Sequence, residues 1–280
     1  MNYEKQNKKN SVGDTLIRIA MLLIALLLIS HHVKFYLPVS IQVEPFPPIR
    51  IAHAGGQVNR LNYSNSYQAL NENYLKGFRY FEIDLIFTSD HYLVCLHDWN
   101  NSFFRLSGKR STTALSLEEF SQYFSATELT PCTLQGLMSW LESHPDAHIV
   151  TDVKSNNIRA LAMIANLYPK FITRVIPQIY DPRNLADVRE AGFDKVIWTL
   201  YRFSTSKREI LYWMGRLSGP VAVTMPQQLA REGVGSMLKQ YRVTTFTHTI
   251  NSECKFKMFQ KEYDIDEIYT DTLAPKRYYC

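Results

Sequence analysis

The chain has 280 residues, of which 46% are hydrophobic and 20% are charged. This composition supplies a large core and excludes a globally disordered chain. The formal net charge of +5 is mild for this length and suits an anionic substrate or a membrane surface. Because the sequence has no basic stripe with interleaved aromatic residues, it gives no reason to expect a nucleic-acid partner.

The amino-terminal segment predicts a membrane anchor. A polar, basic tail at 1–14 precedes an apolar segment at 15–37, whose uninterrupted core, Ile19–Ile29, has eleven residues. No small-residue cleavage site follows this core, which favours an uncleaved anchor over a cleaved signal peptide or a buried core helix. Basic residues gather before the core, so we expect a single pass through the cytoplasmic membrane, with the rest of the chain on the periplasmic or extracellular side.

A proline-rich spacer at 38–48 separates this anchor from a domain at 49–280, in which eight strand-like runs alternate with helix-like segments. Such alternation predicts a parallel sheet, and eight units match a (β/α)₈ TIM barrel, with a doubly wound open sheet as the alternative. The expected strands are 49–53, 80–87, 148–154, 174–180, 195–201, 220–224, 243–249 and 267–270.

One stretch, at 88–132, breaks the alternation. Its run "HYLVCLHDW" follows the turn signal "TSDH" and predicts an extra strand beside 80–87, and "SLEEFSQYF" predicts a short helix. We therefore expect a compact insertion after the second strand, at the mouth of the barrel.

Titratable residues gather near the ends of the expected strands. Side chains alternate along a strand, so Glu82 and Asp84 share a face, as do Asp152 and Lys154, while His53 ends the first strand. Catalytic groups of α/β barrels lie at this end of the strands. Three carboxylates cannot stay charged there without a cation, and their hard oxygen ligands favour Mg²⁺ or Ca²⁺.

The quoted segments "AHAGG", "NSYQAL", "GFRYFEIDLIFTSDHYLVCLHD", "TDVK" and "IYTD" resemble the glycerophosphodiester phosphodiesterases, a family within the phospholipase-C-like TIM barrels. The resemblance covers nearly all of the chain after residue 49. Its pattern is His-Arg-Gly, Glu-x-Asp, His-Asp and Glu-x-Lys.

Matched position by position, this resemblance assigns three roles. It implies that His53 and His97 are the catalytic acid–base pair, that Glu82, Asp84 and Asp152 bind the metal, and that Lys154 faces the phosphate. Two positions depart from the pattern. Ala54 replaces an arginine, which removes a bidentate phosphate contact. Asp152 replaces a glutamate, and the resulting Asp-x-Lys is similar to sphingomyelinase-D-like phospholipases of the same fold.

Further candidates rest on position alone. Tyr201 and His248 lie at the ends of later strands and are possible pocket residues, and Asp98 either orients His97 or caps a turn. Gly55 and Gly56 lack the lysine and Ser/Thr of a P-loop, and we expect them to let the first loop bend close to the phosphate.

The four cysteines form no CxxC pair and have no zinc spacing. Cys95 lies in an apolar run and is expected to be a core residue. If the domain is exported, a disulfide between Cys132 and Cys254 is an alternative.

The sequence as a whole predicts a metal-dependent phosphodiester hydrolase that acts on glycerophosphodiesters or lipid headgroups, tethered to the membrane by its amino-terminal helix. A phospholipase D or cyclising lyase of the same fold is the second hypothesis, and a non-catalytic, membrane-tethered binding module is the third. The sequence assigns no oligomeric state.

Overall fold

The computed structural model describes residues 19–27, 46–47, 49–124, 128–130, 132–203 and 206–275. The chain divides into two compact units, Met1–Ile41 and Gln42–Cys280. In the first unit, residues 19–27 are helical and their apolar side chains are exposed. No helix among the described residues has the length and apolar character needed to cross a bilayer. Most of the segment predicted as an anchor, 15–37, lies outside the described residues, so the anchor stays a prediction.

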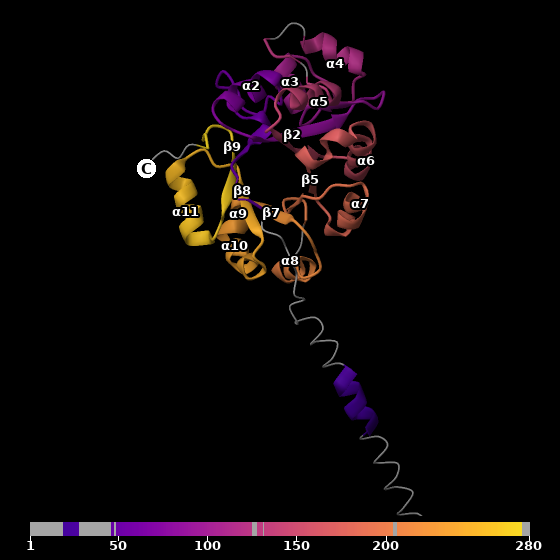
Figure 1. Ribbon diagram of the computed structural model, residues 1–280, viewed down its shortest axis with the longest axis vertical. Helices are drawn as coiled ribbons and strands as arrows, with labels where there is room; N and C mark the ends of the chain where they lie inside the picture. Colours follow the sequence, from indigo (N-terminus) through magenta and orange to yellow (C-terminus); the bar gives the residue numbers. More distant parts are fainter. Residues whose placement is uncertain are drawn as a thin grey trace, which may run out of the picture. The chain divides into compact units, whose positions relative to one another are not determined.

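The second unit is a closed barrel of parallel strands surrounded by helices (Figure 1). Eight strands are parallel to their neighbours, and β1 pairs with both β2 and β9, which closes the sheet and excludes the open doubly wound alternative. The (β/α)₈ prediction is therefore confirmed. The parallel strands are β1 Ile51–Ala52, β2 Tyr80–Phe87, β4 His148–Val153, β5 Val175–Ile179, β6 Val196–Thr199, β7 Val221–Pro226, β8 Thr244–His248 and β9 Glu267–Thr270.

The predicted and observed strands coincide at 80–87 and 267–270, and the others differ by a few residues at their ends. At β1 the expected 49–53 shortens to Ile51–Ala52, and its carboxyl end is cut short because His53 begins a 3₁₀ turn, η1 (His53–Gly55).

Helices follow most strands, and several begin at a serine or threonine that caps them. Ser66 accepts a hydrogen bond from the Ala69 amide at the start of α2, and Thr133 does the same for Gly136 at the start of α5. The α-helices of this unit are α2 Tyr67–Leu75, α3 Asn101–Ser107, α4 Leu117–Phe124, α5 Leu134–Ser143, α6 Asn157–Leu167, α7 Leu185–Glu190, α8 Lys207–Met214, α9 Gln227–Arg231, α10 Val234–Leu238 and α11 Glu253–Tyr263. Short 3₁₀ turns are η2 Pro169–Arg174, η3 Pro182–Asn184 and η4 Lys239–Tyr241.

The barrel interior is apolar in its lower part, near the amino-terminal ends of the strands. Seven strands each contribute one buried side chain to a single cluster, Tyr80 of β2 packs against it, and Phe46 from the preceding segment joins it. This apolar cluster fills the amino-terminal end of the barrel. The charged residues of β2 and β4 therefore lie toward the carboxyl-terminal end. The seven strand residues are Ile51, Val150, Ile176, Ile197, Ala222, Phe246 and Tyr269.

The insertion at the mouth contains β3 (Leu93–Cys95), α3 and α4. β3 pairs antiparallel with the upper part of β2, which confirms the predicted extra strand. Its helices share an apolar cluster that includes Trp99, Phe103 and Phe120. The insertion therefore has a small core of its own beside the barrel.

A disulfide joins the two ends of this insertion. Cys95 is bonded to Cys132, 37 residues further along the chain, and Cys254 is a free, exposed thiol. The suggested Cys132–Cys254 pair is therefore wrong, because the bridge between Val94 and Thr133 brings the two ends of the insertion side by side. Cys95 is buried as expected, but it is also cross-linked. In the chain-entropy model, a closed loop of this length contributes about 4 kcal/mol to the free energy of unfolding.

Candidate active site

Three buried carboxylates meet inside the mouth of the barrel. Glu82 and Asp84 point inward from β2, and Asp84 is the register partner of Asp152 on β4. One oxygen from each of the three residues lies within 4.8 Å of the others, and all three side chains are buried. The predicted metal residues are therefore brought together in a cluster of hard oxygen ligands.

The bonding of Glu82 shows that this cluster fits a divalent cation. Its Oε2 accepts a hydrogen bond of 2.7 Å from the Ala54 amide, while Oε1 is buried and has no partner among the described groups. Burial and the neighbouring charge of Asp84 raise the pKa of Glu82 to about 8. A buried oxygen without a donor and a carboxyl with a raised pKa both indicate that a positive ligand belongs beside it.

Lys154 supplies one positive charge to this cluster. Its Nζ lies 3.1 Å from Asp84 Oδ1 and is also hydrogen-bonded to Asp152. Burial alone would lower the pKa of Lys154, but the two aspartates outweigh it and raise the pKa. The same ammonium donates to Tyr201 Oη at 3.0 Å, and Tyr180 donates to Asp152 from the side. Lys154 therefore lies between the acidic cluster and a tyrosine wall.

Asp84 is held from the other side by the side-chain amide of Asn65, which stands in the quoted segment "NSYQAL" but was given no role. Asn65 Nδ2 donates to Asp84 Oδ2 at 3.0 Å, and Asn65 Oδ1 accepts from the Asp84 amide at 3.0 Å. Burial would raise the pKa of Asp84, but Lys154, His97 and this hydrogen bond outweigh it and lower the pKa. Asp84 is therefore a fixed carboxylate, whereas Glu82 readily takes up a proton.

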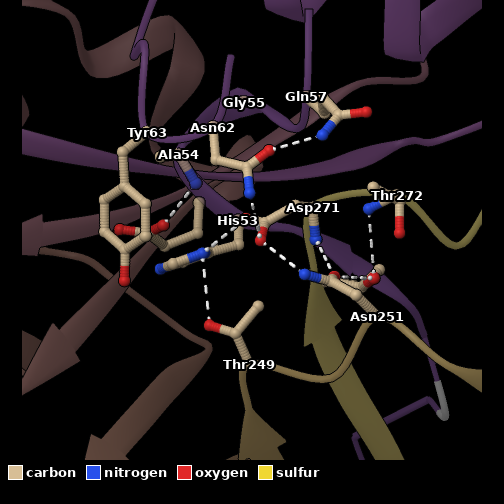
Figure 2. A network of polar contacts seen from close by, with 12 residues as sticks. His53, Ala54, Gly55, Gln57, Asn62, Tyr63, Thr249, Asn251, Asp271 and Thr272 are labelled. Atoms are coloured by element: carbon tan, nitrogen blue, oxygen red, sulfur yellow. Dashed lines mark hydrogen bonds and ion pairs between the residues drawn. The ribbon is translucent and has the colours of Figure 1, made fainter. Parts of the chain in front are cut away.

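His53 enters the cavity from η1, directly after β1. Its Nδ1 lies 2.9 Å from Asp271 Oδ1 and 3.3 Å from Thr249 Oγ1, which leaves Nε2 free of these partners (Figure 2). Burial would lower the pKa of His53, but the hydrogen bond to Asp271 and the charges of Glu82, Asp271 and Asp84 raise it. A carboxylate that binds one ring nitrogen sets the tautomer and presents the other nitrogen to the cavity.

Asp271 is itself fixed by two asparagines. Its Oδ2 accepts from Asn251 Nδ2 at 2.7 Å and from Asn62 Nδ2 at 3.2 Å, and its amide donates to Asn251 Oδ1 (Figure 2). Asp271 follows β9 at the same end of the barrel as the metal cluster. It was quoted in the resemblance but given no role there, although its place after a strand is the signal that identified the other acidic residues.

His97 has an equivalent partner in the insertion. Its Nδ1 lies 2.9 Å from Asp98 Oδ2. Asp98 Oδ1 accepts from the amides of Asn100, Asn101 and Ser102 at the start of α3. Asp98 therefore does both of the things expected as alternatives: its carboxylate contacts His97 and also caps a turn.

Tyr63 lies between the two histidines. Its ring centroid is 4.2 Å from that of His53 and 5.9 Å from that of His97, both edge-on. Burial and the charges of Glu82 and Asp84 raise the pKa of its hydroxyl, so the phenol stays protonated. Nothing in the sequence pattern singled out this residue.

All eight predicted site residues line one cavity of about 200 Å³, together with Tyr63, Gln178, Thr199 and Tyr269. Tyr201 and His248 lie on the wall opposite the insertion. His248 is bonded through Nδ1 to Thr224 Oγ1 at 3.1 Å, and burial lowers its pKa to about 3, so its ring is neutral. The structure thus brings the predicted residues together, while their catalytic roles stay predictions.

The first loop bends tightly at Gly56, and its approach to the phosphate stays a prediction. Gly56 has a φ of +88°, and a Cβ there would lie 2.4 Å from the Asn73 side chain. Asn73 Nδ2 donates to the carbonyls of Gly55 and Gln57, so the loop is fastened to α2. This packing turns the Ala54 amide toward Glu82.

Replacing Asp271 with asparagine should lower the activity through His53. An amide can donate to Nδ1 and stabilise the wrong tautomer, so we expect kcat to fall by at least about tenfold. Because Asp271 raises the pKa of His53, the variant should also lower that pKa, which an NMR titration of the ring measures directly. Asp187→Asn, at an exposed position of α7, is the matched control. An unchanged His53 titration in Asp271→Asn would contradict the proposed contact.

The fold and site geometry define a TIM barrel with an acidic cluster and two carboxylate-bound histidines at its mouth. Comparison with solved structures finds this fold in a glycerophosphodiester phosphodiesterase from Thermotoga maritima, at 18% identity and a TM-score of 0.63, over 80% of this chain and 94% of that one. A glycerophosphoryl diester phosphodiesterase from Parabacteroides distasonis matches at 16% identity and a TM-score of 0.60, over 80% and 83%.

A third similar structure is an Oleispira antarctica phosphodiesterase in complex with the product sn-glycerol-3-phosphate. It matches at 15% identity and a TM-score of 0.61, over 80% of this chain and 93% of that one. No family model and no curated protein matches the sequence. At these identities the comparisons show a shared fold. The fold is the one that the resemblance to the glycerophosphodiester phosphodiesterases predicted.

Proposed function

We propose that the chain is a metal-dependent phosphodiesterase that hydrolyses glycerophosphodiesters or the headgroup diesters of lipids. The observation that carries this proposal is the pairing of two carboxylate-bound histidines with the buried triad of Glu82, Asp84 and Asp152 in one cavity. A phosphodiester needs a positive site for its phosphoryl oxygens, a base for the nucleophile and an acid for the leaving alkoxide. The cavity contains residues suited to each of these tasks.

The similar structures support the same reading. Those from Thermotoga maritima and Parabacteroides distasonis are glycerophosphodiester phosphodiesterases, and the Oleispira antarctica enzyme holds a glycerol phosphate product. The catalytic cavity suits an anionic phosphodiester, because Lys154 lines it and three acidic residues there can bind a cation.

In this mechanism Glu82, Asp84 and Asp152 would hold one Mg²⁺ or Ca²⁺, which would supply Lewis-acid polarisation of the phosphoryl oxygens and lower the pKa of the attacking hydroxyl. Lys154 turns toward the phosphate and stabilises charge on its oxygens. His53, oriented by Asp271, accepts the proton of the nucleophile. His97, oriented by Asp98, donates a proton to the leaving alkoxide.

A panel of phosphodiesters assayed with EDTA, Mg²⁺ or Ca²⁺ tests this function. We expect hydrolysis that EDTA abolishes and one of the two ions restores, with glycerol phosphate as the product of glycerophosphodiesters. A cyclic phosphate as the final product would indicate a cyclising lyase, and free glycerol with retention of phosphate on the other alcohol would indicate cleavage on the opposite side. Absence of turnover on every diester, with the metal bound, would indicate a binding module.

We also propose that an uncleaved amino-terminal helix tethers the catalytic domain to the outer face of the cytoplasmic membrane. The apolar run and the preceding basic residues support it, and a disulfide between Cys95 and Cys132 suits an oxidising compartment. Protease added to intact spheroplasts should digest the domain beyond Pro38. Complete protection would reverse the topology, and a shortened soluble product in the medium would indicate a cleaved signal peptide.

A further inference from the structure

A second cavity adjoins the active site on the side of the insertion. It is open, has a volume of about 490 Å³ and shares Tyr63 and His97 with the catalytic cavity. Its remaining walls come from Arg60 and Asn62 in the first loop and from Asp98, Ser102 and Arg105 in and just before α3. A group that leaves the phosphate past His97 would therefore pass directly into this second cavity.

The charge of the second cavity is positive. Its one carboxylate, Asp98, already accepts hydrogen bonds from three backbone amides and from Ser102 Oγ, and it contacts His97. Arg105 Nη1 and Nη2 donate to the carbonyls of Asn62 and Tyr63, which consumes two of its five N–H donors. The charge of Asp98 acts on this guanidinium, but among the described residues no ion pair joins Arg105 to an acidic group.

Arg60 is exposed and has no hydrogen bond or ion pair among the described residues. It occupies a tight turn in which Val58 and Leu61 exchange both backbone hydrogen bonds. The two turn residues, Asn59 and Arg60, have φ values of +49° and +63°. Such a turn favours Asn-Gly, so an arginine with a left-handed backbone costs on the order of 1 kcal/mol where glycine would cost nothing. Arg60 lines the second cavity from a turn position that glycine would occupy without strain.

We propose that this second cavity binds the leaving alcohol of the diester and selects alcohols that carry an anionic group, of which a phosphomonoester best matches two guanidinium groups. The inference rests on the proposed function and specifies its substrate class. Arginine forks bind phosphate oxygens in a bidentate manner, whereas a choline or ethanolamine cation would be repelled. Arg60 and Arg105 would thus determine specificity without taking part in the chemistry.

The test compares two substrates that differ only in the charged group, glycerophosphoinositol and glycerophosphoinositol 4-phosphate. We expect kcat/KM to be at least about tenfold higher for the phosphorylated alcohol in wild type at low salt, and this preference should shrink as NaCl screens the charges. Arg60→Gly should reduce the ratio to below about threefold, and Arg60→Lys should retain most of it. Asn59→Gly changes the same turn without removing a charge, so its ratio should equal that of wild type.

Binding measurements separate this inference from the proposed function. In the His53→Ala background, calorimetry should show tighter binding of the 4-phosphate than of glycerophosphoinositol, and Arg60→Gly should remove the difference. Equal affinities, or a preference that survives Arg60→Gly, would overturn the anionic subsite even if both diesters are hydrolysed. Tighter binding of the 4-phosphate that depends on Arg60, without turnover of either compound by wild type, would support the subsite and reject the hydrolase.

Discussion

Replacing either His53 or His97 with alanine should lower kcat by at least about 10²-fold, the usual scale for general acid–base catalysis. KM should change little, because the lost proton transfer belongs to the transition state. Each histidine is bound through Nδ1 to a carboxylate, so each presents Nε2 as the group that exchanges the proton. His144→Ala, at the far end of α5, is the matched control.

A substrate with a good leaving group distinguishes the two roles. A p-nitrophenyl phosphodiester needs little protonation of its leaving oxygen, so it should rescue the variant that lacks the general acid and not the variant that lacks the base. We expect rescue of His97→Ala, because His97 borders the second cavity. Near-wild-type rates for both variants on every diester would show that the histidines are structural.

Glu82→Gln should abolish binding of the divalent cation and with it the metal-dependent activity. The amide keeps the size of the side chain and can still accept from the Ala54 amide, but it loses the negative charge that a hard cation requires. Calorimetric titration with Mg²⁺ and Ca²⁺ measures the loss, and Glu118→Gln, at an exposed position of α4, serves as the control. Unchanged affinity for both ions in Glu82→Gln would remove the triad from the metal site.

The same variant should change how the metal-free protein depends on pH. The pKa of Glu82 is raised from 4.5 to about 8 in the folded chain, so between these values the folded state holds a proton that the unfolded chain releases. The protonated Glu82 carboxyl therefore contributes its full stabilisation to the folded state below about pH 4.5, and this stabilisation is lost as the pH rises through about 8. In EDTA, wild type should therefore lose on the order of 4 kcal/mol more than Glu82→Gln between pH 5 and pH 9. Urea denaturation at the two pH values measures this loss. An equal change in the free energy of unfolding for wild type and Glu82→Gln would contradict the prediction.

Local patterns in the sequence were sufficient to predict the barrel and most of the site. Two-residue alternation placed Glu82 and Asp84 on one face, and the parallel register then set Asp84 beside Asp152. These features depend on neighbours within one strand or on adjacent strands. The position of His97 followed in the same way from the run that became β3.

Contacts across the closure of the barrel could not be predicted in this way. His53 and Asp271 are 218 residues apart, and their strands become neighbours only because β1 pairs with β9. The disulfide was missed for a related reason: an isolated bridge between Val94 and Thr133 aligns Cys95 with Cys132, and no periodicity in the insertion indicates that bridge. The positive cavity depends on a turn whose arginine occupies a position where the pattern favours glycine.

The disulfide makes the insertion a covalent ring, since the chain between Cys95 and Cys132 begins and ends at the same bond. A single proteolytic cut within the exposed segment at 107–113 would therefore leave both fragments attached to each other. His97, two residues beyond Cys95, would remain tethered to the barrel through β3, and the nicked molecule would separate into two bands on a gel only after a reductant is added. A protease would thus break the backbone of the insertion without releasing His97.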